Sequence, residues 1–113
     1  MLDNVFSLKI GEETAGTSLQ GFVTCSYFDL VQTFGEPKTG SSDGKYSMQW
    51  SLEFSAGLFA KTVRATIYDY EGSDYYRGDS SANLNWHIGG DSGAACFYVL
   101  SSLLETLRAR AGA

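Results

Sequence analysis

The sequence predicts a single α+β domain, residues 1–113, in which an antiparallel β-sheet is packed by a short helix and a C-terminal α-helix. Thirteen Gly, one Pro, seven Tyr and seven Phe favour tight turns between aromatic-rich strands. Several segments alternate apolar with polar residues, whereas the C-terminal segment has apolar residues at helical spacing. A chain of 113 residues is long enough for one hydrophobic core and too short for two.

The N-terminal third predicts two strands and a helix. Residues 5–10 alternate as a half-buried strand does, 11–16 predict a turn, and 19–25 form a second apolar run that we expect to be the hairpin partner of the first. Ser26 and Asp29 have the spacing of a capping box, and Gly35 and Pro37 predict the end of a helix of about two turns. Residues 38–45 have no periodic pattern and predict a loop.

The middle of the chain carries the clearest strand pattern. Residues 46–54 alternate strictly and predict a strand with one buried face, which 55–57 connect to a long returning strand at 58–70. In that strand Arg64, Thr66, Tyr68 and Tyr70 share the face opposite Val63, Ala65 and Ile67. Residues 71–83 then predict a loop, and 84–88 predict one more short strand before Gly89 and Gly90.

The last segment predicts the C-terminal helix. We expect Asp91 or Ser92 to cap its first turn, and Gly112 lies where the helix should stop. Six side chains at helical spacing predict its buried stripe: Cys96, Phe97, Leu100, Leu103, Leu104 and Leu107.

Charge and cysteine content restrict the function classes. Eight Lys and Arg against 13 Asp and Glu give a net charge of −5, which argues against binding of DNA or another long polyanion. No apolar run is long enough for a membrane span, and the start has no signal-peptide pattern, so we expect a cytoplasmic protein, in the host cell if it is phage-encoded. Cys25 and Cys96 belong to no CxxC or Cys/His cluster, and we expect two buried free thiols.

No arrangement of residues predicts a catalytic or metal site, and no cofactor is implied. The segment 90–93 matches a serine-protease loop, but the only histidine, His87, lies just upstream on the preceding strand. Asp69 belongs to a group of carboxylates with Glu71, Asp74 and Asp79 that we interpret as a solvated loop. The amides of Gly89 and Gly90 could face a phosphate before a helix, although Asp91 opposes an anion there.

The most suggestive set of residues is aromatic and cationic. Rings that stack on a base, amides that can read it and arginines that pair with phosphate all occur between residues 64 and 87. The same residue types suit a protein interface, and each has an ordinary structural role open to it. The ligand-binding candidates are Tyr68, Tyr70, Asn85, Trp86, His87, Arg64 and Arg77, together with Arg108 if an oligomer brings the end of the last helix to the site.

Three segments together resemble a known family. Residues 34–37 (FGEP), 65–70 (ATIYDY) and 85–90 (NWHIGG) are similar to segments of the first family of Thoeris anti-defence proteins, which are phage-encoded. The resemblance implies an antiparallel sheet with C-terminal helices and no enzymatic activity. It also implies sequestration of a cyclic ADP-ribose isomer in pockets between protomers of a homo-oligomer, some members also capturing cyclic oligonucleotides. The insertion at 71–83 departs from the family pattern.

We therefore expect a homo-oligomeric protein that binds and sequesters a cyclic nucleotide immune signal without cleaving it. The alternative is a small phage inhibitor that binds a host defence protein directly, as anti-CRISPR proteins do, through its acidic surface. A hydrolase acting on the nucleotide has no recognisable nucleophile or metal site in the sequence.

Overall fold

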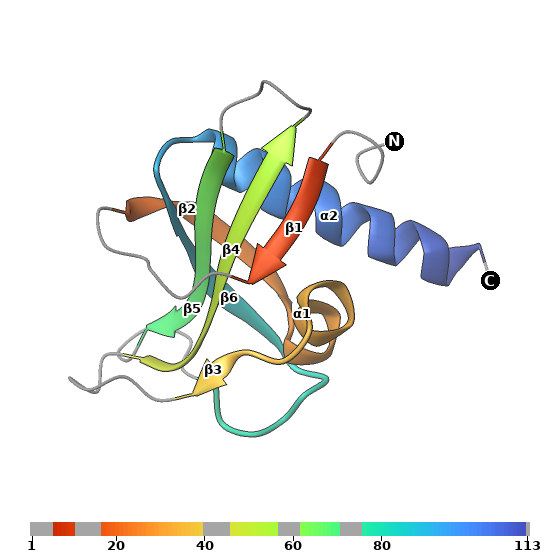
Figure 1. Cartoon of the computed structure of the whole chain (residues 1–113). Helices are drawn as coiled ribbons and strands as arrows, with labels where there is room; N and C mark the ends of the chain where they lie inside the picture. Colours follow the sequence, from red (N-terminus) through yellow and green to blue (C-terminus); the bar gives the residue numbers. More distant parts are fainter. Residues whose placement is uncertain (1–5, 11–16, 40–45, 57–61, 71–75, 113) are drawn as a thin grey trace.

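The computed structural model of the chain describes residues 6–10, 17–39, 46–56, 62–70 and 76–112. The elements, in chain order, are β1 Phe6–Ile10, β2 Ser18–Ser26, α1 Tyr27–Phe34, β3 Lys38–Thr39, β4 Tyr46–Ala56, β5 Thr62–Tyr70, β6 Asn83–Gly90 and α2 Ala94–Ala111. The strands form one antiparallel sheet in the order β1-β4-β5-β6-β2, with β3 paired to β4 beside β1 (Figure 1). This confirms the predicted α+β class, an antiparallel sheet packed by a short helix and a C-terminal helix.

Helix α1 begins and ends where its local signals predict. The Ser26 hydroxyl accepts a hydrogen bond from the Asp29 amide at 3.0 Å, and the Asp29 carboxylate accepts one from the Ser26 amide at 3.1 Å. This is a complete capping box, which satisfies donors that the first helical turn leaves without partners. At the other end Gly35 has a φ of 86°, which favours glycine, and its amide donates to the carbonyl of Val31 at 2.8 Å.

The core lies between the sheet and the two helices. The alternation in β4 buries Met48, Trp50, Leu52 and Phe54 on the helix-bearing face. The rings of Trp50 and Trp86 meet edge to face at 5.5 Å. Their indole N–H groups donate to the carbonyl oxygens of Gly35 at 2.7 Å and Cys25 at 2.9 Å, so neither is left buried without a partner.

The predicted pairing of the first two strands is wrong. Residues 19–25 form most of β2, but β2 pairs with β6, and β1 pairs with β4. Of the predicted loop at 38–45, Lys38–Thr39 form β3. The predicted turn at 11–16, the remainder of that loop, the turn residue 57 and the start of the returning strand at 58–61 lie outside the described residues.

Two predictions for the C-terminal helix are confirmed only in part. The helix begins at Ala94 with Gly93 as its N-cap, and the Asp91 carboxylate pairs with Arg64 instead of capping. The Ser92 hydroxyl accepts a hydrogen bond from the Ala94 amide at 3.4 Å, so Ser92 contributes to the first turn without being its N-cap. Of the predicted buried stripe, Leu103 is buried and Cys96 is half-buried, whereas Phe97, Leu100, Leu104 and Leu107 are exposed. The other side chains that α2 buries are Ala95 and Val99. The predicted end is confirmed, because Gly112 is the C-cap.

Both cysteines are free, as predicted, but only Cys25 is buried. Burial, followed by the nearby Asp29 carboxylate, raises the pKa of the Cys25 thiol to about 12. Cys96 is half-buried against β2, where a Cβ on Gly21 would come within 2.8 Å of its sulfur.

Candidate functional site

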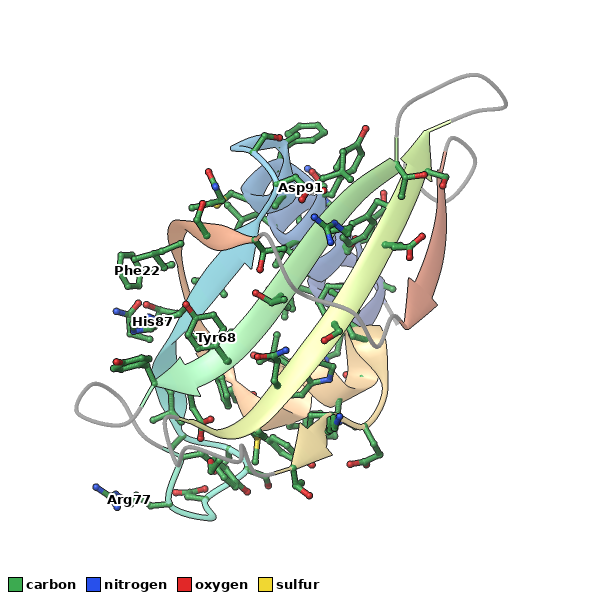
Figure 2. All side chains as sticks on the ribbon, turned by 60° about the vertical axis from the view of Figure 1, so that its left-hand side comes forward. Phe22, Tyr68, Arg77, His87 and Asp91 are labelled. Carbon is green, nitrogen blue, oxygen red and sulfur yellow. The ribbon has the colours of Figure 1, made fainter. Side chains whose placement is uncertain are left out.

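The sheet has one face without helices, and this face carries most of the predicted ligand-binding side chains. Because successive residues of a strand point to opposite faces, burial of Ile67 and Trp86 against the helices places Tyr68 and His87 on the other side. Figure 2 shows Tyr68 and His87 projecting from this helix-free face, with α2 behind the sheet.

Four rings from three adjacent strands meet there. The ring of His87 lies at the centre of the group and contacts the other three. Its centroid lies 4.9 Å from that of Phe22, 5.3 Å from that of Tyr68 and 5.5 Å from that of Tyr70. The Tyr70 and His87 rings are nearly parallel, at 14°, whereas Phe22 meets His87 at 77°. We call Phe22, Tyr68, Tyr70 and His87 the aromatic patch.

Register explains why these rings meet. Tyr68 lies directly opposite His87 in the β5–β6 pair, and Phe22 lies directly opposite His87 in the β2–β6 pair. Tyr70 follows Tyr68 by two residues and so shares its face. Phe22 is the patch residue that the sequence did not identify, because its position depends on β2 pairing with β6.

The patch is open to solvent at its margins. Phe22 is 49% exposed and Tyr70 is 40% exposed, while Tyr68 and His87 are half-buried between them. Burial, followed by the neighbouring Tyr70, raises the pKa of Tyr68, so its phenol is neutral and able to donate a hydrogen bond at neutral pH. Exposed ring faces beside hydroxyl and imidazole groups can stack on a planar ligand and hydrogen-bond its edge.

Amide side chains border the patch. Gln49 lies opposite Tyr68 in the β4–β5 pair, and Asn85 lies two residues before His87 and therefore on the same face. The Gln49 side-chain amide donates to the hydroxyl of Ser51 at 3.1 Å. These groups supply the donors and acceptors that a heterocyclic base needs along its edge.

Trp86 is separated from the other candidates. It is fully buried on the helix-bearing face, where its indole packs against Trp50 and donates to the Cys25 carbonyl. This places Trp86 in the hydrophobic core, away from the aromatic patch.

The three candidate arginines are not gathered around the rings. The Arg64 guanidinium pairs with the Asp91 carboxylate through bonds of 2.6 and 3.1 Å, and Arg64 lies four strand residues, about 13 Å, from Tyr68. Figure 2 shows Arg77 far below the patch and Asp91 at the opposite end of the sheet. Arg108 lies in the last turn of α2, and this helix packs on the face of the sheet opposite the aromatic patch (Figure 1).

The glycine pair at the end of β6 serves close packing. A Cβ on Gly89 would come within 2.5 Å of the Thr66 hydroxyl, and one on Gly90 within 2.4 Å of the Ala95 Cβ and 2.7 Å of the Arg64 carbonyl. Gly90 therefore lets α2 approach the sheet, whereas Gly89 leaves room for Thr66 of the neighbouring strand. The Asp91 carboxylate accepts from the Arg64 backbone amide at 3.2 Å beside them. Neither feature supports the phosphate site considered for these residues.

Asp69 is not part of a solvated loop, contrary to the sequence interpretation. It is fully buried in β5, and its carboxylate accepts hydrogen bonds from the amides of Ser47 at 3.0 Å, Met48 at 2.9 Å and Tyr76 at 3.1 Å. The Ser47 hydroxyl donates to it as well. Asp69 thereby joins the start of β4 to the segment that precedes β6, across a register shift between Tyr46 and Gln49.

Two other features are absent from the described part of the chain. There, no three His, Cys, Asp or Glu side chains lie together as a metal site would require. None of its helices has the length and apolar character needed to cross a membrane. Comparison of the chain with protein-family models, with curated proteins and with solved structures gives no match.

Proposed function

We propose that this protein binds a small nucleotide on the aromatic patch and sequesters it without cleaving it. The observation that carries the proposal is the convergence of three rings, those of Phe22, Tyr68 and Tyr70, on the ring of His87 on the helix-free face. Stacking of a base on an aromatic side chain stabilises binding by about 1 to 3 kcal/mol and needs no basic surface, which suits a chain with a net charge of −5.

The ligand class follows from the resemblance to Thoeris anti-defence proteins. We propose a cyclic nucleotide immune signal, either a cyclic ADP-ribose isomer or a cyclic oligonucleotide, acting in the cytoplasm of a phage-infected cell. In such a ligand the base would stack on an exposed ring face at the margin of the patch, that of Phe22 or of Tyr70, and its edge would face Asn85 and the Tyr68 hydroxyl. The phosphates would need a partner other than Arg64 in its present ion pair with Asp91.

The test measures retention and integrity of the ligand. The purified protein is incubated with cyclic ADP-ribose isomers and with cyclic di- and trinucleotides, free ligand is removed, and the heat-released fraction is analysed by mass spectrometry. Release of the intact ligand supports sequestration, and release of an altered ligand identifies an enzyme instead.

A matched pair of variants tests the site. Phe22→Ala removes a ring of the patch that is 49% exposed, whereas Phe28→Ala removes a ring of α1 that is 53% exposed and lies outside the patch. We expect Phe22→Ala to lower retention at least tenfold and Phe28→Ala to leave it unchanged. Equal retention by the two variants would place the ligand elsewhere.

The exposed rings also favour a second candidate function, direct binding of a host defence protein. Exposed aromatic side chains gathered in one patch are typical of protein interfaces. Two results together would support this inhibitor function. The protein would retain none of the nucleotides, and its protection of phage would be abolished by Phe22→Ala but not by Phe28→Ala.

A further inference from the structure

Helix α2 carries a row of large apolar side chains that the fold leaves exposed. Phe97 is 59% exposed, Leu100 44%, Leu104 47% and Leu107 41%. We call these four residues the α2 stripe. The core contacts of the helix use a different line of residues, Ala95, Val99 and Leu103, so the stripe is not needed to hold α2 on the sheet.

The spacing of the stripe is that of a helix-pairing seam. Its members follow one another at intervals of three, four and three residues, which are the a and d positions of one and a half heptads. Residues at this spacing face a second helix along its whole length. A helix face that contacts only water does not require apolar residues at this spacing.

The stripe is also complementary to itself. Its four positions are symmetric about residue 102, so that in an antiparallel pair Phe97 meets Leu107 of the second copy and Leu100 meets Leu104. A two-fold axis requires this kind of match, in which each residue finds its counterpart on an identical surface.

Charge selects the antiparallel orientation. Arg108 lies in the last turn of α2, next in sequence to Leu107 at the end of the stripe, whereas Arg110 in the same turn is paired with Asp29 of α1 at 2.8 Å. A parallel pair would bring the Arg108 side chains of the two copies together, whereas an antiparallel pair separates them to opposite ends and also opposes the two helix dipoles favourably.

The exposed area fits a weak dimer. With about 200 Å² for a fully exposed large apolar residue, four residues near half exposure present about 400 Å² per chain and about 800 Å² in a pair. Flanking side chains add to this, which places the interface at the small end of specific complexes, where association is weak and depends on protein concentration.

We infer that a second copy of this chain covers the α2 stripe, forming an antiparallel two-helix interface with two-fold symmetry. Because α2 packs on the helix-bearing face of the sheet, this interface leaves both aromatic patches uncovered (Figure 2). The inference is independent of what the patch binds.

The first test is sedimentation equilibrium at protein concentrations from about 1 to 200 µM. Wild-type protein should shift from monomer to dimer mass within this range, and Leu104→Glu should remain a monomer throughout. Leu19→Glu is the matched control, because Leu19 is 51% exposed on β2 and should leave the dimer intact. Circular dichroism and thermal unfolding check that both variants fold.

The second test addresses orientation. Phe97→Glu and Leu107→Lys should each abolish the dimer alone, and an equimolar mixture should restore it. Only the antiparallel pair places the introduced carboxylate of one copy against the introduced ammonium group of the other and keeps the second Phe97–Leu107 contact. A wild-type monomer at about 200 µM, or a dimer that Leu104→Glu leaves intact, would overturn the inference. If both single variants abolish the dimer and their mixture does not restore it, the antiparallel arrangement is overturned.

Discussion

Replacement of Asp69 by Asn should destabilise the fold strongly, although the two side chains have nearly the same shape. One carboxylate oxygen accepts from the amides of Ser47 and Met48, and the other from the Tyr76 amide and the Ser47 hydroxyl. An asparagine keeps one acceptor oxygen and turns an NH2 group toward the remaining donors. Its best orientation retains the two β4 amides and leaves the Tyr76 N–H facing another donor.

The magnitude follows from these contacts. A buried donor without a partner costs about 1 to 3 kcal/mol, and each retained bond loses its ionic character. Relief of burying a charge offsets part of this, which leaves a net loss of about 2 to 3 kcal/mol in the free energy of unfolding. For a chain of 113 residues this corresponds to a fall of about 10 °C in Tm.

Urea unfolding followed by tryptophan fluorescence measures the loss, since Trp50 and Trp86 both lie in the core. The control is Asp79→Asn, because the Asp79 carboxylate is exposed and accepts its bonds from nearby Ser81 within the same turn. We expect the control to unfold at the same urea concentration as the wild type. An Asp69→Asn midpoint equal to that of the wild type, with an unchanged m value, would refute the account of Asp69 as the anchor of this segment.

Two further predictions concern the packing of α2 and the cap of α1. Gly90→Ala should lower the free energy of unfolding, measured in urea, by about 1 to 3 kcal/mol, because the added Cβ meets Ala95 and backbone at under 3 Å. Gly93→Ala should be neutral or slightly stabilising, because Gly93 has open space around it and helical backbone angles. Equal unfolding midpoints for the two variants would contradict this. Burial opposes ionisation of Asp29, but the hydrogen bond from Arg110 and the capping bonds outweigh it and hold its pKa below 3.8. The stability that this carboxylate contributes is therefore present above pH 3.8 and is lost as the pH falls through the lowered pKa. Wild-type protein should lose more stability between about pH 5 and pH 2 than Asp29→Asn does, and parallel pH profiles would count against the cap as its source.

Features governed by neighbours in sequence were predictable. The capping box at Ser26, the stop at Gly35, the alternation of β4 and the end of α2 at Gly112 all depend on interactions within a few residues. The α+β class followed from these elements, because one-sided strands and an amphipathic helix must bury their apolar sides together.

Features governed by distant neighbours were not predictable. Which strand pairs with β2 depends on a partner far along the chain, and the close approach at Gly90 selects the small Ala95 rather than a leucine as the contact of α2 with the sheet. The same long-range pairing brings Phe22 to His87.

The misplacement of Trp86 is of another kind. Asn85, Trp86 and His87 are consecutive in a predicted strand, and alternation alone separates Trp86 from its two neighbours. The sequence therefore already contained the signal that only two of these three residues can share a ligand face.

The order of strands in the sheet also has a consequence for folding kinetics. β4, β5 and β6 are neighbours in both sequence and space, but β1 and β2 each reach their places by closing loops of about 40 to 70 residues. Closing such long loops costs conformational entropy before the contacts between the strands can form. The β4-β5-β6 meander should therefore form first, and β1 and β2 should then dock on its two edges. Folding should accordingly be slower than the short β4-β5-β6 connections alone would allow, and its rate should be set by the two outer strands.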